Sequence, residues 1–309
     1  MKVKLTLGDL IGSGTRALRR YTGTLLAVFV VQSIVAIAVM LACAVVLAQA
    51  FSHMPVFDEA VDGDLISLIG CVMFAKANLL ACVGIAFGAL LLWELATWFL
   101  VGGIYGVFAQ RPEGRGDTAR AFGASGTATY LSYARLALCQ VPGWIIALFV
   151  LALCTNSMAM RIEHAITVSD LVVPALVIFG PFLAILHVLW TIGDYARVEL
   201  TLRHDSHDPG VLKTYFRTIG FVIRRPLTLL HASLGWIVWI AITAGFMWLA
   251  SGHPMYGTEG AVTLFVIRSG VSLARMAIRF AVLAGQVDLG GSRPLPPRRV
   301  ELKTEPKEQ

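Results

Sequence analysis

The strongest constraint on this chain is a series of apolar blocks, each about as long as a bilayer is thick. Six blocks recur along the sequence, at about 25–50, 79–108, 136–154, 171–192, 227–250 and 261–285. Because an α-helix rises about 1.5 Å per residue, each block can cross about 30 Å of hydrocarbon. A soluble core would instead spread its apolar residues over amphipathic helices and short strands. The blocks therefore predict an all-α integral membrane protein with six transmembrane helices.

Composition agrees with a membrane environment and argues against nucleic acid as a partner. Of the 309 residues, 57% are hydrophobic and 14% are charged, which leaves too little polar surface to coat a soluble globule. The net charge is +6, but the basic residues lie in short segments between the apolar blocks. A nucleic-acid-binding protein gathers such residues in one patch or stripe. We therefore interpret the basic segments as topology signals and expect no nucleic-acid partner.

The distribution of Lys and Arg predicts the orientation of the chain, because positively charged loops are retained on the cytoplasmic side of a membrane. Basic residues are frequent before the first block, in every second loop and after the last block, whereas the other loops hold only Lys76 and Arg161. Both termini are therefore predicted to be cytoplasmic, in a multi-pass protein of the bacterial inner membrane. We divide the chain into an N-terminal interfacial segment (1–23), a six-helix transmembrane domain (24–288) and a disordered cytoplasmic tail (289–309).

Three similar stretches indicate an internal repeat. Residues 8–20, 116–130 and 210–225 each mix polar and apolar side chains, and each precedes an outward-going membrane helix. This composition is typical of helices that lie in the membrane interface. At the inner ends of two blocks, residues 103–106 (GIYG) are paralleled by residues 193–196 (GDYA). The sequence thus predicts three hairpin units, each a cytoplasmic interfacial helix followed by two transmembrane helices.

Charged residues inside the apolar blocks form the candidate site. Arg268, Arg275 and Arg279 are spaced by seven and four residues, which places them on one face of a helix. A charge in hydrocarbon is costly, so this arginine face is expected to meet partners, water or an interface. Glu94, Asp194 and Glu199 are the expected counter-charges. The candidate intramembrane charge network comprises Glu94, Asp194, Arg197, Arg268, Arg275 and Arg279.

This network has two interpretations. Buried charge pairs often fix helix register and packing, and they need have no further role. Intramembrane charges also line substrate and proton paths.

The sequence offers no support for catalysis, since it contains no H-E-x-x-H, G-x-S-x-G or Walker A run. We expect no enzyme, no metal site and no cofactor. The leading hypothesis is a noncatalytic membrane module that organises membrane lipids or a membrane protein partner through its basic interfacial helices. The alternative is a small transporter or channel in which the arginine face binds an anionic substrate.

Residues 193–199 (GDYARVE), followed by an interfacial segment with Phe216, resemble a pattern in poorly characterised bacterial six-helix membrane proteins. These proteins include relatives of the membrane domain found beside glycerophosphodiester phosphodiesterases. The resemblance covers about residues 16–289 in helix order. In the phosphodiesterases a separate soluble domain carries the chemistry, and we expect no such domain here. The resemblance therefore implies a membrane module without that activity, and it transfers no catalytic residue.

Overall fold

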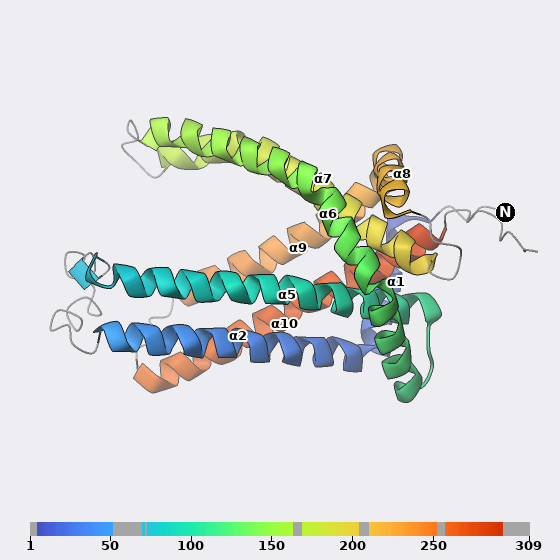
Figure 1. The fold of residues 1–309 in the computed structure, drawn as a ribbon, viewed down its shortest axis with the longest axis horizontal. Coiled ribbons are helices and arrows are strands. Elements are labelled where there is room, and N and C mark those ends of the chain that lie inside the picture. Colours follow the sequence, from blue (N-terminus) through green and yellow to red (C-terminus); the bar gives the residue numbers. More distant parts are fainter. Residues whose placement is uncertain are drawn as a thin grey trace, which may run out of the picture. The chain divides into compact units, whose positions relative to one another are not determined.

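The computed structural model describes residues 5–51, 70–71, 73–162, 169–203, 210–251 and 257–292, and these residues are helical apart from short connections. No strand occurs within these ranges. Figure 1 shows the order of the helices. They are α1 (Leu7–Arg20), α2 (Thr22–Phe51), α5 (Lys76–Gln110), α6 (Arg115–Ile162), α7 (Ser169–Leu202), α8 (Val211–Arg224), α9 (Pro226–Ser251) and α10 (Gly257–Gly291). The all-helical fold predicted from the apolar blocks is confirmed for the described part of the chain.

Within the described residues, five helices are long and apolar enough to span a membrane. They are α2, α5, α6, α7 and α9, matched over Thr22–Phe51, Lys76–Gln110, Arg115–Ile162, Val173–Leu202 and Pro226–Ala250. The sequence predicts six such helices, and α10 is not among those found in the part of the chain that the structure describes. It is long enough at 35 residues, but Arg268, Arg275 and Arg279 interrupt its apolar sequence. A multi-pass membrane protein is therefore supported.

The predicted interfacial helix at 116–130 is not a separate element, and that prediction is wrong. Residues 116–130 belong to α6, a continuous helix of 48 residues that also contains the third apolar block. Between Tyr130 and Leu136 the sequence has neither Gly nor Pro to end a helix. Pro142 follows inside the helix, and the helix continues past it. The other two predicted interfacial segments do form short separate helices, α1 and α8.

The first turn of α1 is closed by reciprocal hydrogen bonds between Thr6 and Asp9. The Thr6 hydroxyl accepts from the Asp9 backbone N–H at 3.3 Å, while the Thr6 backbone N–H donates to the Asp9 carboxylate at 2.8 Å. This arrangement is a capping box, which satisfies backbone donors that a helix start leaves free. The N–H and hydroxyl of Thr6 lower the pKa of the Asp9 carboxyl below its ordinary value.

The chain forms two compact units, of which the smaller is Tyr21–Val101. It contains α2 and most of α5. The Asn78 amide donates to the backbone oxygen of Val46 at 3.1 Å, and Cys43 and Cys82 each donate to the other's backbone oxygen. These contacts pair the two helices in opposite directions, because residues later in α5 meet residues earlier in α2.

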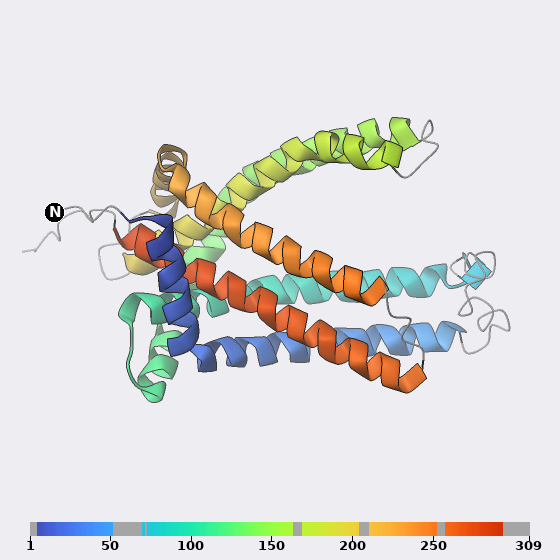
Figure 2. The same ribbon diagram turned by 180° about the vertical axis from the view of Figure 1, so that it is seen from behind.

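The larger unit consists of Met1–Arg20 and Gly102–Gln309. Within it, α6 and α7 run side by side and curve together (Figures 1 and 2). Tyr133 in the first half of α6 meets Thr201 near the end of α7, with 2.6 Å between the hydroxyl oxygens. Further along, the Cys154 thiol donates to the backbone oxygen of Ile178 at 3.0 Å. The α9 and α10 helices pair similarly, since a β-carbon at Gly235 would lie 2.6 Å from the Val282 side chain.

The term hub is used here for one region of the larger unit. In it, α1, α8 and the start of α6 contact the ends of α5, α7 and α10. Each of its three short segments packs on the end of a long helix. In α1, a β-carbon at Gly14 would lie 2.8 Å from the backbone oxygen of Ala281 in α10, and Figure 2 shows α1 crossing that helix. In α6, the Ser125 hydroxyl donates to the Gly102 oxygen of α5 at 3.0 Å. In α8, the Thr218 hydroxyl donates to the Glu199 carboxylate of α7 at 3.3 Å.

The hub also contains many of the fully buried large side chains, including Leu10, Tyr105, Tyr133, Val198 and Val222. The end of α10 belongs to it and continues to Gly291, slightly beyond the predicted start of the tail. The rest of that predicted tail, residues 293–309, lies outside the described residues. Packing is therefore tightest where the polar segments of the sequence join its apolar blocks.

Candidate functional site

Asp194 of α7 is the centre of a buried polar cluster in the hub. Its side chain is 2% exposed. One carboxylate oxygen accepts from the Arg279 guanidinium of α10 at 2.7 Å, and Arg197 lies 3.8 Å from the same oxygen. The other oxygen accepts from the Gln286 amide of α10 at 3.2 Å. Both oxygens therefore have partners, as a buried carboxylate requires.

Tyr105 of α5 extends this cluster to a third long helix. Its hydroxyl donates to the Gln286 side-chain oxygen at 3.2 Å and lies 3.5 Å from the Asp194 backbone oxygen. Tyr105 and Gln286 are both fully buried. We refer to Tyr105, Asp194, Arg197, Arg279 and Gln286 as the Asp194 cluster. The cluster connects α5, α7 and α10. Its members Tyr105, Asp194 and Gln286 each follow a glycine by one or two residues.

The structure brings three of the six predicted network residues together, namely Asp194, Arg197 and Arg279. Arg275 instead donates to the Thr243 hydroxyl at 2.6 Å, with its guanidinium carbon 4.6 Å from the Trp239 ring centre. Arg268 is exposed. Glu94 belongs to the smaller compact unit, where its carboxylate accepts from the Trp98 indole at 3.0 Å.

Sequence reasoning missed Tyr105 and Gln286 as members of this cluster. The repeat contained the signal, because Tyr105 falls in the 103–106 segment that parallels 193–196. Gly285-Gln286 is a third glycine followed by a polar side chain at the end of a long helix. The ends of α5, α7 and α10 therefore share one pattern, a glycine followed within two residues by a polar side chain of the cluster.

A second ionic cluster attaches α8 to α7. The Glu199 carboxylate is 7% exposed and contacts two arginines, Arg203 at 3.1 Å in the same helix and Arg217 of α8. Thr218 of α8 donates to the other Glu199 oxygen. One carboxylate thus holds two guanidiniums and a hydroxyl. Its contacts explain how a short polar helix is fixed against a long one.

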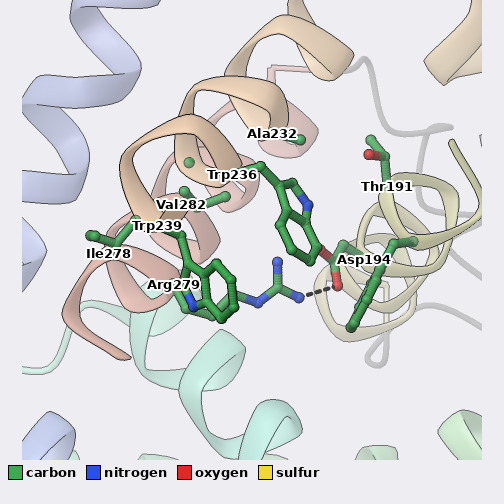
Figure 3. Close-up of a pocket in the computed structure, with 10 residues that line it drawn as sticks. Thr191, Asp194, Ala232, Trp236, Trp239, Ile278, Arg279 and Val282 are labelled. Atoms are coloured by element: carbon green, nitrogen blue, oxygen red, sulfur yellow. Dashed lines mark hydrogen bonds and ion pairs between the residues drawn. The ribbon is translucent and has the colours of Figure 1, made fainter. Parts of the chain in front are cut away.

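A cavity of about 290 Å³ lies between α7, α9 and α10, beside the Asp194 cluster. Asp194 and Arg279 form its polar wall, and Trp190, Trp236 and Trp239 contribute aromatic walls (Figure 3). The indoles contact one another edge to face, with ring centres 5.4 Å apart for Trp190 and Trp236. Such a combination of apolar walls with a few polar groups is typical of a small-molecule site.

The chemistry available at this site is binding by charge and shape. Among the described residues, no three His, Cys, Asp or Glu side chains gather to hold a metal ion. Arg279 offers N–H donors and Asp194 offers a carboxylate that is already bonded.

Fold and site together define an all-helical protein of multi-pass membrane type with a mostly apolar cavity, which contains one ion pair, between three of its helices. Comparison of the chain with protein-family models, with curated proteins and with solved structures finds no match. The resemblance to bacterial six-helix membrane proteins therefore stays a prediction.

Proposed function

We propose that this chain is a noncatalytic module of the bacterial inner membrane that binds anionic lipid through amphipathic helices at the cytoplasmic surface. In this proposal α10 is the sixth membrane-spanning helix and both termini are cytoplasmic. The chain forms three hairpin units, α2 with α5, α6 with α7 and α9 with α10. The contacts within each pair and the three hub contacts support this organisation.

The observation that carries the proposal is the presence of three distinct faces on α8. One face packs in the hub through Thr214, Thr218 and Val222. A second face is apolar and exposed, with Leu212, Phe216 and Ile223 exposed by 57%, 62% and 68%. Because these three residues are separated by four and seven positions, they form one stripe along the helix.

The third face of α8 is basic, with exposed Lys213 and Arg224. A soluble protein rarely leaves such an apolar stripe in water, whereas a helix lying in a membrane interface needs it. Cations beside the stripe attract anionic headgroups of the cytoplasmic leaflet. The α1 helix has a related pattern, with Ile11 exposed by 45% and Arg16 and Arg19 exposed nearby.

An environment-sensitive fluorophore on α8 tests this proposal in liposomes. It is attached to a single cysteine introduced as Phe216→Cys or as Lys213→Cys, after the five natural cysteines have been replaced. Lipids that carry a quencher on their acyl chains should quench the probe at position 216 strongly and the probe at position 213 weakly. Including anionic lipid should increase the difference. Equal and weak quenching at both positions would show that α8 does not lie in the membrane and would refute the proposal.

The alternative function is transport of an anionic substrate along the arginine face of α10. One observation favours it, since Arg279 lines a cavity. The other two arginines have different surroundings, because Arg275 is bonded to Thr243 and Arg268 is exposed. Uptake of labelled phosphate by proteoliposomes, lost in Arg279→Gln and kept in Arg268→Gln, would favour transport over the lipid-binding proposal.

A further inference from the structure

The cavity between α7, α9 and α10 has one carboxylate and one guanidinium in its wall, those of Asp194 and Arg279. Asp194 is its one carboxylate, and it contacts the guanidiniums of both Arg279 and Arg197. A third guanidinium, that of Arg275, stacks on Trp239, which itself lines the cavity. Only Arg279 of these three arginines reaches the cavity wall, but the Asp194 carboxylate is already in contact with two guanidiniums, so the site favours an anion over a cation.

Arg279 is oriented to bind such an anion directly. It uses one terminal nitrogen for Asp194, and no other described protein group accepts a hydrogen bond from it. Its side chain is 42% exposed, although its partner Asp194 is 2% exposed. Figure 3 shows the guanidinium between the Trp239 and Trp236 rings, next to the Asp194 carboxylate. A planar guanidinium with free N–H groups is suited to phosphate and carboxylate oxygens.

A cationic ligand does not fit this site, even though tryptophan rings often bind ammonium groups. The ligand would need Asp194 as its counter-charge. One oxygen of that carboxylate is bonded to Arg279, and the other is bonded to Gln286. A second cation would have to displace these partners and would lie beside the Arg279 guanidinium.

Apart from Thr191, the remaining walls of the cavity are apolar and provide room for part of a larger molecule. Trp190 and Trp236 contact each other edge to face, and Ala232, Ile278 and Val282 complete the surface. A volume of about 290 Å³ is at the small end of ligand pockets, which suits a headgroup with a few attached carbons.

We propose that this cavity is a binding site for an oxyanion, a phosphate or carboxylate group, with Arg279 as its principal ligand and the tryptophans enclosing an attached apolar part. The site is separate from the exposed faces of α1 and α8, so it does not depend on the surface function proposed above. The oxyanion can belong to a lipid headgroup or to a free anion, and the two sources differ in what the apolar walls contribute.

Thermal unfolding of the full chain in a neutral detergent tests the site with three probes. They are lysophosphatidic acid, an uncharged monoacylglycerol with the same chain, and inorganic phosphate. A ligand that binds the folded state raises the melting temperature in a saturable way. Lysophosphatidic acid should do so and the monoacylglycerol should not. If inorganic phosphate acts at the same concentration as lysophosphatidic acid, the site is still an oxyanion site, and its natural ligand is a free anion.

Variants assign the effect to the cavity. Arg279→Gln should weaken the apparent affinity for lysophosphatidic acid at least tenfold. Arg268→Gln removes an exposed charge from the same helix and should leave the affinity unchanged. The double variant Lys213→Gln/Arg224→Gln removes the basic face of α8 and should also leave it unchanged, which separates this site from surface binding.

Ala232→Leu fills the cavity without altering charge and should likewise weaken binding tenfold or more. It decides the question if Arg279→Gln does not fold. Two results would overturn the inference. One is the absence of a saturable shift with either anion, and the other is an affinity that is unchanged in the cavity variants.

Discussion

At the residue scale, the Asp194 cluster shows how a membrane helix retains charge in its interior. Asp194 has partners from its own helix and from α10, and Tyr105 adds a hydroxyl from α5. Each polar atom of the carboxylate is satisfied, so the charge is retained without an unpaired group. Removing one member leaves the polar groups of the others buried. The free energy of unfolding then falls by more than the net contribution of the lost hydrogen bond or ion pair.

A double-mutant cycle at Asp194 and Arg279 measures this coupling. Asp194→Asn leaves Arg279 and Arg197 without their carboxylate, and Arg279→Gln leaves Asp194 with fewer donors. We expect both single changes to lower the free energy of unfolding and the double change to recover part of it, with a coupling of about 1 to 2 kcal/mol. Unfolding in mixed micelles provides the measurement. Additive effects of the two changes would mean that the pair is not coupled.

At the scale of elements, close contact between short and long helices depends on small side chains. Gly14 allows α1 to approach the backbone of α10, and Gly103 allows α5 to accommodate the Phe122 ring of α6, which would lie 2.7 Å from an added β-carbon. The sequence places Gly14 within a mixed polar and apolar segment that also matches an interfacial helix, and it places Gly103 near the end of an apolar block. Their role in packing is visible only when the partner helix is known.

Two alanine substitutions in α1 test that packing. A β-carbon at Gly14 would lie 2.8 Å from the Ala281 oxygen, whereas one at Gly12 would meet only the flexible end of Arg16 at 3.5 Å. Gly14→Ala should therefore destabilise the protein by about 1 to 3 kcal/mol through overpacking. Gly12→Ala should stabilise it by about 0.5 to 1 kcal/mol, because Ala is the better helix former. Hydrogen exchange in α1 should rise in the first variant and not in the second; equal exchange in both would contradict close packing.

At the scale of the whole molecule, the sequence predicts the helices better than it predicts their partners. The apolar blocks indicate how long each helix is and that its surroundings are apolar, so the helical class and most of the membrane-spanning helices follow from them. The continuity of α6 between the predicted interfacial segment and the third apolar block does not follow from the blocks, because a helix continues unless a residue breaks it. The partner of Arg275 was also unpredictable, since Thr243 and Trp239 are ordinary residues within an apolar block and carry no charge signal.

The topology is a prediction for the intact cell. Single cysteines at Ser52 and Gly257 should react with a membrane-impermeant reagent added from outside, whereas one at Ser206 should react only after the membrane is opened. A reporter at Gln309 should be active only in the cytoplasm. The physical reason is the positive charge of the loops on that side. Labelling of Ser206→Cys in sealed cells would contradict the orientation.

The packing of α1 on α10 joins the first described helix to the last one. A ribosome produces Gly14 more than 260 residues before its contact Ala281. During that interval α1 lacks its partner, and a membrane surface or a chaperone can cover its apolar side. The contact between α1 and α10 can therefore form only after α10 has been synthesised, and a chain that stops before α10 would leave α1 exposed to quality control.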